Sequence, residues 1–293
     1  MKILITGRNG QLGSAIIKLF NEKECPLGKL DKNYFYSQVS GVGKDTLDIT
    51  SLENVKDYFM KFRPDIVINT AAYTNVDGCE SNIDLAFQVN ALGPKNLAIA
   101  CEEIKAKLIH ISTDYVFDGQ NKVPYREFDL PSPINIYGKS KYFGEEYVKQ
   151  FCSKYFILRT GWLYGYTGKN FVKTILKVSK EKSSLEVIND QIGSPTNAED
   201  LVYHILELAL TDEYGIYHCT GNSECSWYEF AKAIIQYAHI DCKIHPISSY
   251  AYKNIAKRPP YSSLDPMMLR CTIGDKMRHW QHALKDFINT LSL

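Results

Sequence analysis

Short apolar runs alternate with amphipathic stretches through the first two-thirds of the chain. The bounded, β-rich runs that predict buried strands are KILIT, DIVINTAA, KLIHIST and YFILRT, with NYFYSQVS as a further candidate. The stretches whose apolar residues recur at helical spacing are QLGSAIIKLF, SLENVKDYFMKF, IDLAFQVNALGPKNLAIACEEI and NIYGKSKYFGEEYVKQF. This repeated order of strand, helix and strand predicts an α/β fold with a doubly wound parallel sheet and right-handed crossovers.

The alternation loosens after about Trp162. Helices are expected in NFVKTILKVSK, AEDLVYHILELAL, SWYEFAKAIIQYA and WQHALKDFINTL, and short strands in LEVIND and GIYHCTG. Because no repeat, low-complexity segment or flexible linker is visible, we expect this second part to pack on the first. We predict one domain at residues 1–160 and a smaller α/β region at residues 161–293, from which some segments return to the first domain.

The composition is that of an ordinary globular protein, with 45% hydrophobic and 23% charged residues among 293. The formal net charge of +1 gives no overall field that would recruit nucleic acid or an anionic membrane surface. No apolar run approaches the ~20 residues that span a bilayer, and KILIT lacks a cleavage pattern, so it reads as a strand and not as a signal peptide. We expect a cytoplasmic protein without nucleic-acid or membrane partners.

The eight cysteines are scattered along the chain, and no pair has C-x-x-C spacing. This pattern favours reduced thiols in a cytosolic protein over a disulfide framework. Because the sequence has no cluster of cysteine and histidine residues, we expect no metal site.

The strand KILIT runs directly into a G-x-x-G-x-x-G turn, after which a helix opens. Glycines let the backbone turn tightly and let a pyrophosphate approach the positive helix N-terminus. The spacing differs from the usual G-x-G-x-x-G fingerprint, and glycine turns between strand and helix are common. Its place at the first strand of a doubly wound sheet still favours a dinucleotide and a Rossmann-type domain. The loop residues expected at this cofactor are Gly7, Arg8, Asn9, Gly10, Gln11, Leu12 and Gly13.

Arg8 is the charged residue of this loop, and it bears on the choice of cofactor. Loops that bind NAD usually have an Asp or Glu about 20 residues later, which holds the ribose 2′-hydroxyl. Here Asp31 comes too early along the chain and Asp45 too late. A missing acid and a nearby guanidinium favour a 2′-phosphate, which arginine binds through two charge-assisted hydrogen bonds. We therefore expect NADPH, with NADH as the alternative if Arg8 points into water.

KLIHISTDYVFDG predicts a strand that ends in hydroxyls and a carboxylate, at the edge where α/β sheets bind their ligands. In the helix that follows, Tyr137 and Lys141 are four residues apart and share one face. A neighbouring ammonium favours the ionised phenol and moves its pKa toward working pH, which suits a proton donor for carbonyl reduction. Thr113 or Ser112 would hold the carbonyl oxygen. With 20 tyrosines in the chain, a Y-x-x-x-K pattern by itself is weak evidence for catalysis, because a tyrosine in a helix usually packs against its neighbours.

The motifs ITGRNGQLG, AAYTNVD, STDYVFDG, YGKSKYFGEE, LRTGWLYG and NDQIGSPT resemble those of the dTDP-4-dehydrorhamnose reductase family, within the extended short-chain dehydrogenase/reductases. The resemblance extends over nearly the whole chain. It implies reduction of the 4-keto group of dTDP-4-dehydro-L-rhamnose by NADPH, which gives dTDP-L-rhamnose for cell-surface polysaccharide synthesis. Residues 161–293 would bind the sugar nucleotide.

The resemblance also implies roles for individual residues. Thr113, Tyr137 and Lys141 would form the catalytic triad, in which Thr113 and Tyr137 touch the substrate and Lys141 holds the nicotinamide ribose. The further cofactor contacts that it implies are Asp48, Ile49, Ala71, Ala72, Tyr73 and Asn90. The further substrate contacts are Asp114, Trp162, Asn170 and Arg258, the last two at the pyrophosphate. Simpler interpretations stay open: a turn residue for Asp114, hinge packing for Trp162 and a surface charge for Arg258.

The chain departs from the family at one position. Some bacterial relatives form a dimer bridged by Mg²⁺ through carboxylates, one of them early in the first helix, where this chain has Ala15. We therefore expect a monomer or a weak homodimer. Two other functions stay open: reduction of another nucleotide 4-keto-6-deoxyhexose, and a non-catalytic dinucleotide-binding role like that of the regulatory subunit of methionine adenosyltransferase.

Overall fold

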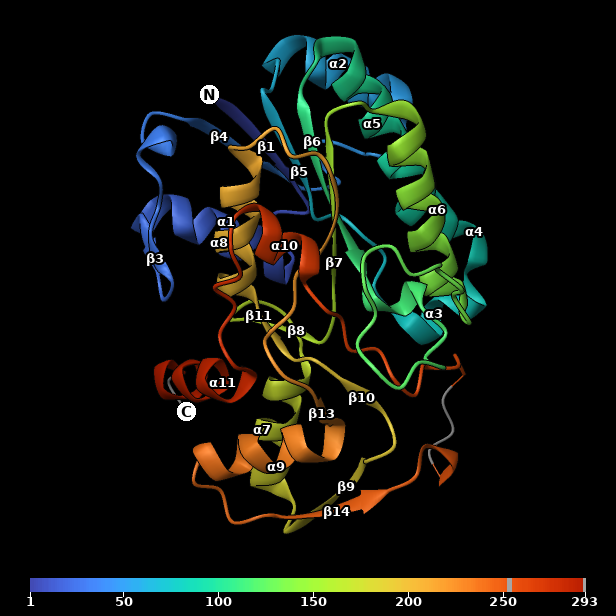
Figure 1. Ribbon diagram of the computed structural model, residues 1–293, viewed down its shortest axis with the longest axis vertical. Coiled ribbons are helices and arrows are strands. Elements are labelled where there is room, and N and C mark those ends of the chain that lie inside the picture. Colours follow the sequence, from blue (N-terminus) through green and yellow to red (C-terminus); the bar gives the residue numbers. More distant parts are fainter. Residues whose placement is uncertain (252–254, 292–293) are drawn as a thin grey trace.

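A parallel six-stranded sheet forms the centre of the protein (Figure 1). The computed structural model describes residues 1–251 and 255–291. The sheet has the strand order β12-β7-β6-β5-β1-β4, and every neighbouring pair runs parallel. Its strands are β1 (Lys2–Thr6), β4 (Gln38–Val42), β5 (Ile66–Asn69), β6 (Lys107–Thr113), β7 (Tyr155–Thr160) and β12 (Gly215–His218). The predicted doubly wound α/β fold is confirmed.

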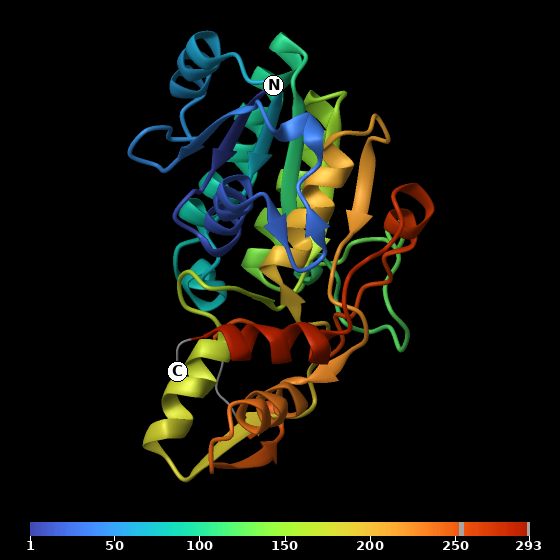
Figure 2. The same ribbon diagram turned by 90° about the vertical axis from the view of Figure 1, so that its left-hand side faces the viewer.

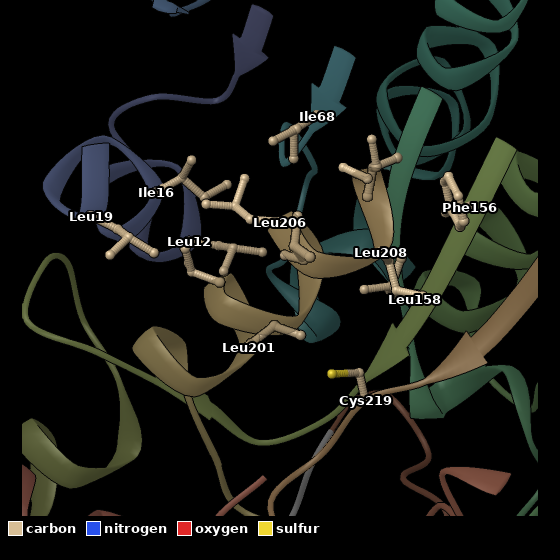
Figure 3. Close-up of a cluster of buried hydrophobic side chains, with 14 of the residues drawn as sticks. Leu12, Ile16, Leu19, Ile68, Phe156, Leu158, Leu201, Leu206, Leu208 and Cys219 are labelled. Atoms are coloured by element: carbon tan, nitrogen blue, oxygen red, sulfur yellow. The ribbon is translucent and has the colours of Figure 1, made fainter. Parts of the chain in front are cut away.

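Helices cover both faces of the sheet, which explains why its strands are hydrophobic throughout. In β1, Ile3 and Ile5 face a core shared with α1 (Gln11–Glu22) and α8 (Ala198–Ala209). Figure 3 shows the α1 side chains beside Leu206 of α8, with the strand that carries Phe156 and Leu158 on the other side of α8. Leu4, between Ile3 and Ile5, faces the opposite core. The helices of that second face are α2 (Leu52–Phe62), α5 (Gly93–Ile104) and α6 (Ile136–Phe151).

The second part of the chain forms a smaller lobe at the end toward which the sheet strands point (Figure 2). Its core contains Phe230, Trp280 and Phe287. The elements of the lobe are α7 (Phe171–Glu181), α9 (Trp227–Tyr237) and α11 (Trp280–Thr290), with the parallel pair β9 (Ser184–Ile188) and β14 (Lys243–Ile247). Meanwhile α8 and β12 return to the central sheet, so the chain passes between the two parts more than once. The boundary at residue 160 stays a prediction.

Short elements connect these layers. The paired ones are β2 (Glu24–Cys25) with β3 (Gly28–Lys29), β8 (Leu163–Tyr164) with β11 (Thr196–Asn197), and β10 (Ile192–Gly193) with β13 (Cys225–Ser226). The short helices are α3 (Val76–Ser81), α4 (Ile83–Phe87) and α10 (Met267–Thr272). Single turns of 3₁₀-helix occupy Lys32–Tyr34, Asp114–Val116 and Ser249–Ala251. Within the described ranges, no helix is long and apolar enough to cross a membrane.

Two sequence predictions need correction. The strand expected in NYFYSQVS begins only at Gln38, because the Asp31 side chain accepts a hydrogen bond from Asn33 N–H and caps a 3₁₀ turn. Tyr34 in that turn is buried, and its hydroxyl donates to Leu206 O at 2.6 Å. The helix expected over residues 83–104 is divided by a π-helical turn at Gln88–Leu92.

A buried ion pair ties α6 to the sheet. Arg159 on β7 and Glu145 on α6 are 2% and 0% exposed. Arg159 donates from Nη2 to Glu145 Oε2 at 2.7 Å and from Nε to Oε1 at 3.0 Å. The Ser112 hydroxyl, on β6, also donates to Oε1. Both charges are satisfied only if β6, β7 and α6 keep this arrangement.

Replacing Glu145 therefore tests how strongly this arrangement depends on the pair. Glu145→Ala leaves the Arg159 guanidinium buried without its counter-charge, and we expect the free energy of unfolding to fall by about 3–5 kcal/mol. Equilibrium urea unfolding measures the change. Glu103→Ala removes a half-exposed partner of Lys56 and is expected to cost less than about 1 kcal/mol. Equal losses for the two variants would contradict the argument.

Candidate active site

The glycine loop lies where the strand order reverses. From β1 the chain goes to β4 on one side and then to β5 on the other, which opens a crevice at the carboxyl ends of β1 and β5. Gly7 has φ +70°, and a Cβ there would lie 2.7 Å from the Ala71 nitrogen. A Cβ on Gly13 would lie 2.4 Å from Gly7 O. The glycines thus allow two backbone segments to approach more closely than side chains would permit.

A cleft of about 310 Å³ opens beside this loop. It brings together seven of the predicted cofactor residues: Gly7, Asn9, Gly10, Asp48, Ile49, Ala71 and Ala72. The α1 N-terminus faces the loop with no side-chain cap and no acidic residue in its first turn, so its amides and positive dipole end are available to an anion. These features fit a dinucleotide with its pyrophosphate at α1.

Arg8 lies between Gly7 and Asn9, which line this cleft, without lining it itself, and 42% of its side chain is exposed. Its Nη1 donates to Gly41 O at 3.3 Å, and its Nη2 lies 3.7 Å from Asp45 Oδ2. The turn after β4 brings the Asp45 carboxylate back to the guanidinium, a proximity that the sequence argument did not anticipate. Any 2′-phosphate at Arg8 meets an acid beside it.

A second cleft of about 470 Å³ continues from the first. Gly10 and Ala72 line both clefts. The other predicted residues that line the second are Gln11, Leu12, Thr113, Asp114, Tyr137, Lys141 and Trp162. The three residues predicted to be catalytic thus share one cavity with part of the glycine loop.

The cap of α6 orients the Tyr137 and Lys141 pair. Asn135 caps the helix by accepting a hydrogen bond from Gly138 N–H at 2.7 Å, and its own amide donates to Lys257 O. Lys141 is 3% exposed and donates from Nζ to Ile111 O at 2.5 Å, which holds the ammonium against β6. Burial lowers the pKa of Lys141 to about 8, although Glu145 one turn later opposes this effect.

The pKa of Tyr137 differs from the sequence expectation. Burial raises the pKa of the phenol well above its usual value, the Thr113 hydroxyl opposes this effect, and the Asp114 carboxylate adds to it. The expectation that Lys141 brings this pKa down toward working pH is therefore wrong. The phenol is protonated at neutral pH, which suits a group that gives up a proton in the reaction.

Asp114 and Thr113 interact with each other at the end of β6. Thr113 Oγ1 donates to Asp114 Oδ1 at 2.9 Å, and both residues are buried. Burial raises the pKa of Asp114 to about 6, although the hydroxyls of Ser262 and Thr113 oppose the rise. Asp114 lies in the 3₁₀ turn after β6 and also lines the cavity, and its contact with a substrate stays a prediction.

Two predicted cofactor residues, Asn90 and Tyr73, are hydrogen-bonded to each other next to the cleft. Asn90, in the π-helical turn, is 0% exposed, accepts a hydrogen bond from Tyr73 N–H at 2.8 Å and donates to Tyr73 O and Ser140 Oγ. Its amide therefore holds the segment after β5 in place. Contact of Asn90 or Tyr73 with a cofactor stays a prediction.

The two residues predicted at the pyrophosphate have protein partners. The Asn170 side chain caps α7 by accepting from Lys173 N–H, and it donates to Gly165 O and to Gln11 Oε1 at 2.9 Å. Arg258 forms an ion pair with Asp77 at 2.9 Å. Neither residue lines the second cleft, whereas Lys169, directly before Asn170, does. Their contact with a substrate stays a prediction.

Trp227 and Thr160 are among the cavity-lining residues that sequence reasoning missed. The Trp227 indole stacks on Trp162 at 3.4 Å between ring centroids and 3° between planes. Trp162 adopts φ +49°, and Gly193 leaves room for its ring, since a Cβ there would lie 2.5 Å from it. Thr160 ends β7 as Thr113 ends β6, so the same signal, a buried strand that ends in a hydroxyl, predicts it. No local pattern points to Trp227.

Comparison with known proteins agrees with this geometry. The RmlD substrate binding domain family matches residues 1–293. The chain belongs to this family. The family resemblance drawn from the motifs is thereby confirmed.

Relatives of this RmlD family member match it over nearly their whole length. The spore coat polysaccharide biosynthesis protein SpsK of Bacillus subtilis is 38% identical over 291 residues, covering 99% of this chain and 98% of that protein. A dTDP-4-dehydrorhamnose reductase of Aggregatibacter actinomycetemcomitans is 37% identical and covers 97% of each chain.

Solved structures of the RmlD family are similar in fold. A dTDP-4-dehydrorhamnose reductase of Clostridium acetobutylicum superposes with a TM-score of 0.94 at 44% identity, over 100% of both chains. The enzyme of the same name from Bacillus anthracis, solved in complex with NADP, gives a TM-score of 0.92 at 43% identity over 99% of both chains. A UDP-glucose 4-epimerase of Thermus thermophilus, at 21% identity and a TM-score of 0.80, shares the fold.

The buried ammonium of Lys141 makes stability depend on pH. The pKa is about 8 in the folded protein and about 10.4 in an unfolded chain, so between these values the unfolded chain binds more protons and stability rises with pH. Lys141→Met removes that rise. We expect the free energy of unfolding of the wild type, relative to the variant, to increase by about 2–3 kcal/mol from pH 7 to pH 10.5.

Urea unfolding across this pH range measures the difference between the two proteins. Lys139→Met, which removes an exposed lysine from the same helix, is the control and is expected to show no such dependence. A pH-independent difference for Lys141→Met would contradict the depressed pKa.

Proposed function

We propose that this protein reduces the 4-keto group of dTDP-4-dehydro-L-rhamnose with NADPH to give dTDP-L-rhamnose. The observation that carries the proposal is the cavity in which Thr113, Tyr137 and Lys141 adjoin the glycine loop. The RmlD relatives named dTDP-4-dehydrorhamnose reductase, one of them solved with NADP, support the substrate and the cofactor. NADPH is the source of the hydride when it is bound at the glycine loop.

The residues of the chain supply the proton and hold the reacting groups. Tyr137 donates its phenolic proton to the carbonyl oxygen as the carbon is reduced, and the alcohol forms. Its high pKa keeps that proton in place until negative charge develops on the oxygen. The Lys141 ammonium, charged below about pH 8 and held against β6, would hold the nicotinamide ribose hydroxyls, as the family resemblance implies. Thr113 orients the oxygen, while Asp114 and Trp162 contact the sugar.

The proposal also covers the oligomeric state of the protein and its location in the cell. We place it in the cytoplasm as a monomer or a weak homodimer that takes a sugar nucleotide as its substrate. All eight cysteines are free thiols, which suits a reducing compartment. Ala15, at the position of the metal-bridging carboxylate in some relatives, argues against a dimer held by a shared cation. Asn170 and Arg258 remain candidates for the pyrophosphate, with Lys169 as the cavity-lining cation nearby.

The decisive assay follows the absorbance of reduced nicotinamide in the presence of NADPH and dTDP-4-dehydro-L-rhamnose. Tyr137→Phe removes only the phenolic hydroxyl, so we expect kcat to fall by roughly 100-fold or more, while the NADPH dissociation constant stays within about twofold. Tyr142→Phe, on the same helix, is the control and should keep its activity. Turnover near the wild-type value would refute the role of Tyr137.

The same assay separates the competing functions. Wild-type protein that binds dinucleotide tightly but oxidises no NADPH would favour a regulatory subunit over an enzyme. Faster turnover of another nucleotide 4-keto-6-deoxyhexose would keep the chemistry and change the substrate.

Arg8 and Asp45 decide the cofactor preference in opposite directions. Arg8→Ala removes a charge-assisted contact worth roughly 1.5–3 kcal/mol, so we expect kcat/KM for NADPH to fall about 10- to 100-fold and that for NADH to change little. Asp45→Asn removes the neighbouring negative charge and should shift the preference toward NADPH. Steady-state kinetics with both cofactors measures these ratios, and Arg270→Ala, far from the loop, is the control. Equal losses with both cofactors would exclude Arg8 as the 2′-phosphate contact.

A further inference from the structure

Two hydroxyls lie next to each other at the bottom of the second cleft. Thr113 ends β6 and Thr160 ends β7, and the two residues are direct partners in the parallel register. Partners in parallel strands point their side chains to the same face. Both residues are buried, at 4% and 7% exposure, and both line the cavity. The cavity therefore contains a second threonine beside the one that the sequence predicted.

The Thr113 hydroxyl is already engaged with the protein. Its single hydrogen is donated to Asp114 Oδ1, while its oxygen accepts from Tyr115 N–H at 3.2 Å. A hydroxyl has one hydrogen to give. Without a ligand, Thr113 thus gives its hydrogen to Asp114, and it can donate to the substrate carbonyl oxygen only by releasing this bond.

The Thr160 hydroxyl, in contrast, has no hydrogen-bond partner within the described residues. Among the side chains that the structure describes, Thr160 Oγ1 and Asp114 Oδ2 are two of the buried polar atoms without a hydrogen-bond partner, although the Ser262 hydroxyl also lies near the Asp114 carboxylate. Gly161, the residue after Thr160, lies against the Asp114 carboxyl group, since a Cβ on it would lie 2.7 Å from the Asp114 carboxyl carbon. Leaving such atoms unpaired costs about 1–3 kcal/mol each, so a ligand that pairs both gains that stabilisation.

A sugar hydroxyl has the complementary pattern. An ionised carboxylate only accepts hydrogen bonds, whereas a threonine hydroxyl also donates one. A ligand hydroxyl satisfies both at once when it donates to the carboxylate and accepts from the threonine. The ring of a 6-deoxyhexose carries such hydroxyls beside the carbon that is reduced.

We propose that Thr160 is a substrate-binding residue whose hydroxyl donates a hydrogen bond to a sugar hydroxyl, which in turn donates to Asp114 Oδ2. This inference rests on the proposed function, because it takes the ligand to be the sugar of the nucleotide substrate. Trp162, two residues after Thr160, forms the adjoining wall with Trp227. Thr160 thus makes the recognition of the sugar depend on the end of β7 as well as on β6.

The test compares ligands with and without the sugar. Thr160→Val removes the hydroxyl and keeps the shape, and Thr160→Ser keeps the hydroxyl. Calorimetry gives the dissociation constants of dTDP-L-rhamnose, dTDP and NADPH. We expect Thr160→Val to weaken dTDP-L-rhamnose by roughly 10- to 100-fold, with dTDP and NADPH unchanged within about twofold, and Thr160→Ser to restore binding within a few-fold.

Controls separate this effect from a loss of structure. Thr211→Val makes the same change at the opposite edge of the sheet, where Thr211 O accepts a hydrogen bond from Lys107 Nζ. It should leave all three dissociation constants unchanged. The urea midpoint of Thr160→Val should equal or exceed that of the wild type, because the lost hydroxyl has no protein partner.

Other results would overturn the inference. Equal weakening of dTDP and dTDP-L-rhamnose would assign the hydroxyl to the nucleotide, and weakening of NADPH alone would assign it to the cofactor. Unchanged binding of all three would remove Thr160 from the site. Binding is measured without turnover, so the two proposals can fail separately. Wild-type protein that binds dTDP-L-rhamnose but oxidises no NADPH would refute the proposed function without contradicting the binding role of Thr160.

Discussion

The buried pair of Arg159 and Glu145 is the constraint on which the site depends. Two opposite charges lie out of water at the junction of β6, β7 and α6, and each is satisfied only by the other elements. Lys141 precedes Glu145 by one helical turn, so the position of α6 that satisfies the ion pair is also the position that sets the ammonium against β6. Stability and the alignment of the cavity are thus inseparable in this region.

Two kinds of polar group surround the cavity. Those of the supporting structure, such as Asn90, Asn135 and Glu145, have their hydrogen bonds completed within the protein. Thr160 Oγ1 and Asp114 Oδ2, on two residues that line the cavity, have no such partner in the described part of the chain. A rigid frame that is satisfied internally keeps the unsatisfied atoms in fixed positions, and this preorganisation is what a reaction site requires.

Sequence patterns identified candidate site residues where those residues lie close together along the chain. The glycine turn after KILIT, the hydroxyl end of KLIHIST and the spacing of Tyr137 and Lys141 predicted residues that the structure brings together along two clefts. They failed where distance along the chain differs from distance in space, because a turn brings Asp45 to Arg8 and α9 brings Trp227 to Trp162. They also failed for the pKa of Tyr137, since burial depends on every element around the residue.

The bond between Gln11 and Asn170 connects two halves of the molecule that sequence analysis assigned to different ligands. One amide begins α1 beside the glycine loop, and the other caps α7 in the smaller lobe. If a ligand at one amide changes the affinity for the ligand at the other through this bond, the second ligand changes the affinity for the first by the same factor. A substitution at either amide therefore reports on the communication between the two ligands as well as on a single contact.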